Sequence, residues 1–261
     1  MKNKRKGTQS KKVKVLEKKI FTDHSLSFED IEKVRGFFAD NFSHEILFHN
    51  HKKDGSHRFE YPKIQYKLEA DDPLIVAIGE GTKKLKEAFS GLQEIQIGNT
   101  IYPAQSIERA QDFTLEMKDE LKHYYYFKSP YFALNDDNFR EYKKIISNGE
   151  KQECGNMKFI NKHKNNNREE QRKMLERVLT HQLLDLANGF NWRVDRYIEV
   201  QINNFDGYFK EFVRTDQKND TQNKTNVFCF NVNFQSNMLI PNNIGIGRAK
   251  ALGYGQVRRI K

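Results

Sequence analysis

The sequence predicts an α+β protein, built as one large domain or as two of roughly 100–150 residues. The chain has 261 residues, of which 37% are hydrophobic and 20 are phenylalanine, so it holds enough apolar material for a core. Short runs that alternate apolar and polar residues occur in both halves, separated by segments with apolar residues at helical spacing. No apolar run approaches the roughly 20 residues that a membrane-spanning helix needs.

The first half of the chain has the clearer pattern. Val13 to Phe21 alternates apolar and basic residues, which predicts a half-buried strand. Ser27 and Asp30 form a near capping box, and the apolar spacing after them predicts a helix over residues 28–41. The further predicted elements are strands at Phe59 to Leu68 and Pro73 to Ile78, a helix at Gly79 to Phe89 and a strand at Gln93 to Ile97. This order is the split βαβ, or ferredoxin-like, plan.

The second half of the chain is less regular, and no repeat is clear, although it is compatible with a distorted copy of the first half. Its predicted elements are a long strand region from Phe113 to Phe132, helices at Asn138 to Ser147 and Arg168 to Ala187, and strands at Tyr197 to Asn204 and Val227 to Gln235. Polar segments at 148–167, 215–225 and 241–243 read as surface loops.

The charge of the chain indicates a polyanionic partner. The net charge is +10, and a protein gains affinity for nucleic acid by neutralising phosphates. Charge alone does not choose between RNA, DNA and an anionic membrane surface. The Lys-rich segment from Met1 to Lys19 lacks the apolar stretch of a signal peptide, and Cys154 and Cys229 form no CxxC pair. We therefore expect a reduced, cytoplasmic protein without a structural zinc site.

Four glycines near the C-terminus, spaced Gly-x-Gly…Gly-x-Gly, enclose two cations. A backbone without Cβ atoms adopts positive φ and lets a ligand approach its N–H groups, so a loop of this kind suits a phosphate chain. The alternative is a glycine-rich hairpin that merely turns the chain. The residues predicted to grip RNA here are Gly245, Gly247, Arg248, Lys250, Gly253 and Gly255.

Five of the eight histidines lie between His24 and His57, and His49 and His51 are two residues apart. Imidazoles donate and accept protons near neutral pH, so such a pair can serve one phosphodiester as base and acid. Two other interpretations remain open: an incidental surface loop, and a metal site that His57 and Asp54 would complete.

Two further segments mix aromatic or apolar residues with cations. Tyr124 to Phe127 offers rings that could stack on bases, although core packing is the simpler use. Helix 168–187 carries cations along one side, which suit either RNA or a solvated face. The sequence has no P-loop, no GxSxG and no complete Rossmann fingerprint.

Two distant parts of the chain together resemble the CRISPR repeat-RNA endoribonucleases, the sixth Cas family, and most of all the subgroup with a paired-histidine loop. The N-terminal part is Phe48-His49-Asn50-His51, then Tyr61-Pro62-Lys63-Ile64-Gln65-Tyr66-Lys67, then Gly79-Glu80-Gly81 before a helix. The C-terminal part is Phe234 to Pro241 with the glycine-rich stretch after it. Residues from about 100 to 225 match no motif of the family.

The resemblance implies two tandem ferredoxin-like (RRM-like) domains, which we place at residues 1–103 and 104–261. It implies metal-independent cleavage of precursor CRISPR RNA, without a cofactor, by attack of a 2′-hydroxyl on the adjacent phosphate. His49 and His51 match the catalytic histidines, and Tyr61 lies near the position of a third contributor. Lys52, Lys63 and His57 are candidate stabilisers of the pentavalent phosphate. The implied partner is repeat RNA, with other effector subunits or a second copy of the chain as further candidates and no membrane.

Two other functions stay open at this stage. A non-catalytic module that holds a repeat RNA within a larger complex would share the glycine-rich stretch and the basic charge. A DNA-binding or repair protein would share the charge alone.

Overall fold

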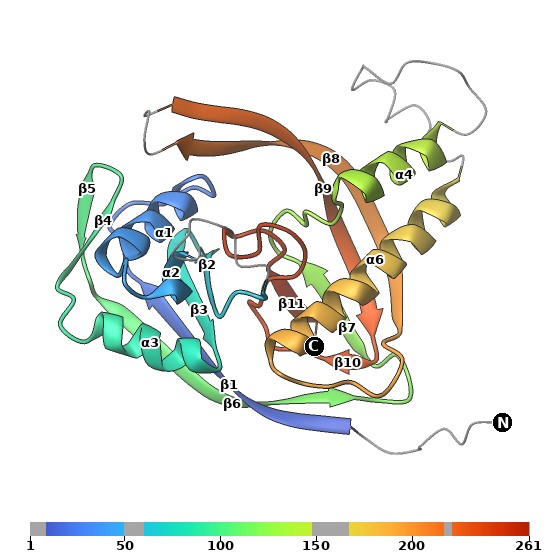
Figure 1. The fold of residues 1–261 in the computed structure, drawn as a ribbon, viewed down its shortest axis with the longest axis horizontal. Helices are drawn as coiled ribbons and strands as arrows, with labels where there is room; N and C mark the ends of the chain where they lie inside the picture. Colours follow the sequence, from blue (N-terminus) through green and yellow to red (C-terminus); the bar gives the residue numbers. More distant parts are fainter. Residues whose placement is uncertain (1–8, 50–59, 148–166, 217–220, 261) are drawn as a thin grey trace.

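The structure is a computed structural model, and it describes residues 9–49, 60–147, 167–216 and 221–260. It has two halves side by side, and the chain enters the second half after β6 (Figure 1).

The first half is a ferredoxin-like unit. Its strands are β1 (Gln9–Ile20), β2 (Ile64–Glu69), β3 (Asp72–Ile78) and β6 (Ser106–Met117), with β10 (Met238–Leu239) added at one edge. The sheet order is β10-β6-β1-β3-β2, and all of its pairings are antiparallel. The helices of this half are α1 (Asp30–Asn41), α2 (Ile46–His49) and α3 (Glu80–Phe89).

The fourth strand of this unit is not the one that the sequence predicts. The segment predicted at Gln93 to Ile97 is indeed a strand, β4 (Glu94–Ile97), but it pairs with β5 (Thr100–Pro103) in a separate hairpin. The fourth position belongs to β6, which pairs with β1 from Gln9↔Met117 to Ile20↔Ser106. The first sheet therefore includes a strand, β6, that lies beyond residue 103, where we place the end of the first domain. The division of the chain into domains 1–103 and 104–261 stays a prediction.

The second half repeats the same plan. Its strands are β7 (His123–Phe127), β8 (Val200–Asp216), β9 (Thr221–Ser236) and β11 (Val257–Ile260), in the order β11-β7-β9-β8, and its helices are α4 (Asp136–Ile146) and α6 (Arg168–Gly189). In place of a second crossover helix, the glycine-rich segment joins β10 to β11. The predicted long strand from Phe113 to Phe132 is wrong, because β6 and β7 within it belong to different sheets.

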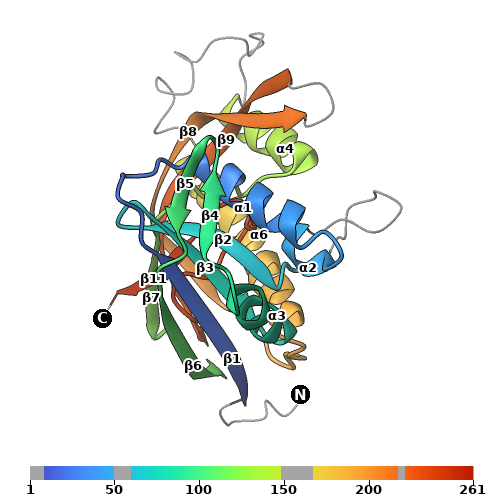
Figure 2. The same ribbon diagram turned by 90° about the vertical axis from the view of Figure 1, so that its left-hand side faces the viewer.

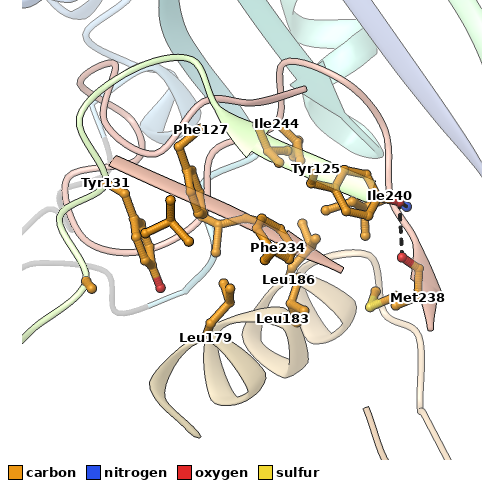
Figure 3. Close-up of a cluster of buried hydrophobic side chains, with 14 of the residues drawn as sticks. Tyr125, Phe127, Tyr131, Leu179, Leu183, Leu186, Phe234, Met238, Ile240 and Ile244 are labelled. Atoms are coloured by element: carbon orange, nitrogen blue, oxygen red, sulfur yellow. Dashed lines mark hydrogen bonds between the residues drawn. The ribbon is translucent and has the colours of Figure 1, made fainter. Parts of the chain in front are cut away.

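One hydrophobic cluster connects the two halves. Val15, Val76 and Ile78 of the first sheet belong to it together with Tyr125, Phe127 and Phe234 of the second. Leu179, Leu183 and Leu186 of α6 face these rings, and Ile240 and Ile244 close the cluster from the C-terminal segment (Figure 3). The Tyr125 hydroxyl, buried there, donates to the Met238 carbonyl and accepts from the Ile240 amide, both at 3.1 Å. The two halves are therefore one packed body, and the predicted fold class, two tandem ferredoxin-like units, is confirmed.

Several helices and several strands lie on opposite sides of this body, while β8 and β9 reach across to α4 (Figure 2). In Figure 2, α1, α2 and α4 lie toward one side, and β1, β6, β7 and β11 toward the other. Among the described helices, none combines the length and the hydropathy that crossing a bilayer requires.

Candidate functional site

His49 is the last residue of the short helix α2, at the edge of the first half. The Arg35 guanidinium, on α1, donates to the His49 carbonyl at 2.5 Å, and the His49 Nε2 lies 3.1 Å from the Ser43 carbonyl oxygen. Phe48, next to it, is buried among the rings of Phe38 and Phe42. The backbone that carries His49 is thus fixed by a buried anchor and by a charge-assisted hydrogen bond.

In space, a single residue, Tyr66, separates the glycine-rich segment from the segment that ends at His49. Tyr66 of β2 donates its hydroxyl to the Phe48 carbonyl at 3.4 Å and its amide to the Ala251 carbonyl at 3.1 Å. Its backbone also forms a parallel bridge with Leu252. The two regions that the sequence singles out, about 200 residues apart in the chain, therefore meet at opposite ends of Tyr66.

Tyr61 is buried between the glycine-rich segment and the end of α6. Its hydroxyl donates to the Gly245 carbonyl at 2.6 Å, and the Lys250 ammonium lies 4.7 Å from its ring centroid. Gly189 fits against the ring because a side chain there would overlap it. Burial raises the pKa of the Tyr61 phenol, so the group stays protonated. In this arrangement, Tyr61 joins two parts of the protein, and the catalytic role that the sequence predicts for it stays a prediction.

Three polar residues, on β2 and directly before it, form hydrogen bonds to the glycine-rich segment and to the end of α6. The Lys63 ammonium donates to the Gly189 carbonyl. The Gln65 side-chain oxygen accepts the Gly245 amide at 2.8 Å. The Lys67 ammonium donates to the carbonyls of Lys250, at 2.6 Å, and Tyr254, at 3.2 Å. Burial lowers the pKa of Lys67 well below its ordinary value, and the charge of Lys250 lowers it further.

The four glycines of the segment are all buried. Gly247, Gly253 and Gly255 have φ values of +96°, +91° and +62°, so they do adopt the predicted left-handed conformation. The amides of Gly245 and Gly255 nevertheless donate within the protein, to Gln65 and to the Pro130 carbonyl. Gly245 permits close packing against β2, the other three glycines permit close approach to other parts of the protein, and these two amides do not stand open as a phosphate cradle.

The two cations of the segment have different surroundings. Arg248 is exposed, and its guanidinium lies 5.1 Å from the Phe132 ring centroid. Lys250 is mostly buried and pairs with Asp185 of α6 at 2.5 Å. Arg248 is therefore the cation of this segment that a ligand in solution can reach.

His51, Lys52, His57 and Asp54 lie outside the described residues, so the structure places neither the second histidine nor the alternative metal ligands. Of the predicted site residues that it describes, His49, Tyr61, Lys63 and the glycine-rich segment come together around β2. Gln65, Lys67, Arg35 and Asp185 belong to the same interface although the sequence did not single them out. The alternation of β2 places Gln65 and Lys67 on one face, but it does not mark that face as buried.

Two family models match this chain. The family model described as the Cas6b N-terminal domain matches residues 11–113, and that described as the Cas6b C-terminal domain matches residues 155–260. An uncharacterised protein of Methanocaldococcus jannaschii, MJ0978, is 25% identical over 138 residues, which cover 52% of this chain and 72% of that protein.

Solved structures share the fold over nearly the whole chain. A crystal structure of Cas6b matches with a TM-score of 0.71 at 24% identity, covering 96% of this chain and 100% of that one. A second, titled as the CRISPR RNA processing endoribonuclease Cas6b, matches with a TM-score of 0.59 at 22% identity over the same shares. Both family models together span most of the sequence, on either side of the interface described above. This chain therefore belongs to the Cas6b family of CRISPR-associated endoribonucleases.

Proposed function

We propose that this protein cleaves precursor CRISPR RNA within its repeats and releases guide RNAs, by a reaction that needs no metal ion. The observation that supports the proposal best is the position of Tyr66, whose hydroxyl holds the backbone before His49 and whose amide holds the glycine-rich segment. A strand of RNA that contacts Arg248 would lie close to the histidine segment.

The chemistry follows from the substrate. RNA carries its own nucleophile, the 2′-hydroxyl beside each phosphodiester. The protein has to align this hydroxyl, accept its proton, and give a proton to the leaving 5′-oxygen. The O2′–P bond forms as the P–O5′ bond breaks, which leaves a 2′,3′-cyclic phosphate and a 5′-hydroxyl.

We assign the two proton transfers to His49 and His51, without choosing which is the base. Cations beside the phosphate, Lys52 and Lys63 among them, would stabilise the charge of the pentavalent state. The glycine-rich segment, through Arg248, would hold the RNA in place. Tyr61 would act by fixing Gly245, because its hydroxyl donates to that carbonyl.

The test is cleavage of a 5′-labelled repeat RNA by excess protein in EDTA. We expect His49→Ala and His51→Ala each to slow cleavage by about 10²–10⁴-fold, the usual contribution of acid–base catalysis, while both still bind the RNA. His24→Ala is the matched control, because His24 is an exposed histidine outside this interface. The product should carry a 2′,3′-cyclic phosphate, and one 2′-deoxy nucleotide at the cut should block the reaction.

Two results would contradict the proposal. Full activity in both histidine variants, with loss of activity in EDTA, would indicate a metal-dependent nuclease. Binding of the repeat without any product would indicate the alternative, a module that holds the RNA for a larger complex.

A further inference from the structure

The second sheet has one covered face and one uncovered face. On β7, Tyr125 and Phe127 point into the core beneath α6, with 0% and 7% of their surface exposed. Tyr124 and Tyr126, which alternate with them, point the other way and are 47% and 37% exposed. Since β7 lies inside the sheet order, both rings stand on the open face and not at its rim.

The side chains beside these rings are mostly polar, and Ile260, 48% exposed, is the apolar one. On β9, Gln235 lies opposite Tyr124 and Asn233 opposite Tyr126. On β11, Ile260 lies opposite Tyr124 and Arg258 opposite Tyr126. Each tyrosine is thus flanked by an amide side chain, and Ile260 is the one aliphatic neighbour among these partners.

Cations border this face. Arg258, which lies opposite Tyr126, and Lys128, which directly follows β7, are close enough to each other that their charges interact. Carboxylates are present as well: Glu69 pairs with Arg258 at 2.5 Å, and the charge of Asp71 reaches Lys128. Cations therefore lie beside the rings, where they can contact a phosphate backbone.

Rings that stack on bases, amides that reach base edges, and cations at the border are the features with which open four-stranded sheets bind single-stranded RNA. Exposed tyrosines beside an arginine also suit a contact between two copies of the chain, and the oligomeric state tests that alternative. We propose that Tyr124 and Tyr126 form a stacking platform for two unpaired bases of the repeat RNA. This inference rests on the proposed function.

The platform is separate from the interface around His49. The rings lie about 7 Å apart along the strand, since they are two positions apart on β7. They face away from α6, and Figure 2 shows β7 and β11 on the opposite side of the molecule from α2. The platform would hold a part of the RNA that is remote from the cut.

The test measures binding to a repeat RNA that cannot be cut, because it carries a 2′-deoxy nucleotide at the cleavage site. We expect Tyr124→Ala and Tyr126→Ala each to raise Kd about tenfold, and the double variant to raise it more. Tyr124→Phe and Tyr126→Phe keep a ring and should stay within about twofold of the wild type. Tyr197→Ala is the control, because Tyr197 is 76% exposed and lies before β8, outside the strands. The dependence of Kd on salt should stay the same, since no cation is removed.

Unchanged Kd in both alanine variants would overturn the inference. So would a change of oligomeric state without loss of RNA binding, which would make this face a contact between two copies of the chain. If the histidine variants lose cleavage while the tyrosine variants bind normally, the platform alone fails. If the tyrosine variants lose binding while the wild type cuts nothing, the proposed cleavage alone fails.

Discussion

Gly255 shows why the glycine-rich segment needs its glycines. Its φ is +62°, and a Cβ added there would lie 1.8 Å from the Ile246 carbonyl oxygen. The Gly255 carbonyl itself accepts the Ile246 amide at 2.9 Å, so the two backbones touch directly. A side chain at this position would push apart the two ends of the segment.

We expect Gly255→Ala to lower the free energy of unfolding by about 3 kcal/mol, because the left-handed conformation costs a non-glycine residue about 1–3 kcal/mol and the clash adds to it. Gly36→Ala is the matched control. Gly36 lies inside α1 with nothing within 4 Å of an added Cβ, so alanine there should stabilise the protein by about 0.5–1 kcal/mol. Urea denaturation of both variants measures the difference, and equal effects at the two positions would contradict this explanation.

At the scale of elements, the local pattern predicts which segments are strands better than it predicts their partners. β4 alternates buried and exposed residues as expected, yet Gly98, with φ of +63°, turns the chain back into a local hairpin. β6 is mostly exposed from Ser106 to Gln111, so its beginning carries little apolar signal. Alternation shows that a strand has a buried face but does not say against which sheet that face packs.

The candidate site shows the same limit. The histidines and the glycine-rich segment are visible as motifs, and the structure brings His49 and that segment to one strand. Gln65 and Lys67 have the alternation of a solvated strand face, yet they are 0% and 1% exposed. Their partners are Gly245, Lys250 and Tyr254, far along the chain, so no local pattern could indicate that these polar groups are buried.

Tyr61→Phe separates a structural role of this hydroxyl from a chemical one. The variant keeps the ring under Lys250 but leaves the buried Gly245 carbonyl without its donor, so we expect a loss of about 1–2 kcal/mol of stability. If the hydroxyl only positions the segment, RNA binding should weaken along with cleavage. If cleavage falls about a hundredfold while binding and stability are unchanged, the hydroxyl acts on the reaction itself. Tyr102→Phe, in the separate β4–β5 hairpin, serves as the control.

At the scale of the whole molecule, Glu69 ties the two halves together outside the core. It ends β2 in the first half, and its carboxylate accepts from Arg109 of β6 and from Arg258 of β11 in the second half. Partial burial raises the pKa of Glu69, but the hydrogen bonds from the two arginines outweigh this and hold the pKa below its ordinary value.

The sign of the resulting pH dependence follows. A carboxyl with a lower pKa in the folded state stabilises the fold above its unfolded pKa, and this contribution disappears as the pH falls through the folded value. We expect Glu69→Gln to destabilise the protein by about 1–2 kcal/mol at pH 7 and by less near pH 3.5. Urea midpoints at both pH values test this, with the exposed Glu120→Gln as the control. An equal loss at both pH values would show that the charge of Glu69 is not what matters.

The hydrogen bonds of the glycine-rich segment with Tyr61, Gln65 and Lys67 join residues that are 180 to 187 positions apart in the chain. On the ribosome, β2 and helix α2, which carries His49, emerge long before the glycine-rich segment is synthesised. During that interval the Lys67 ammonium and the Gln65 side-chain oxygen lack their partners in the glycine-rich segment. This interface therefore forms only after the chain is almost complete, because the segment that closes it is the last to be made, as is β10 at the edge of the first sheet.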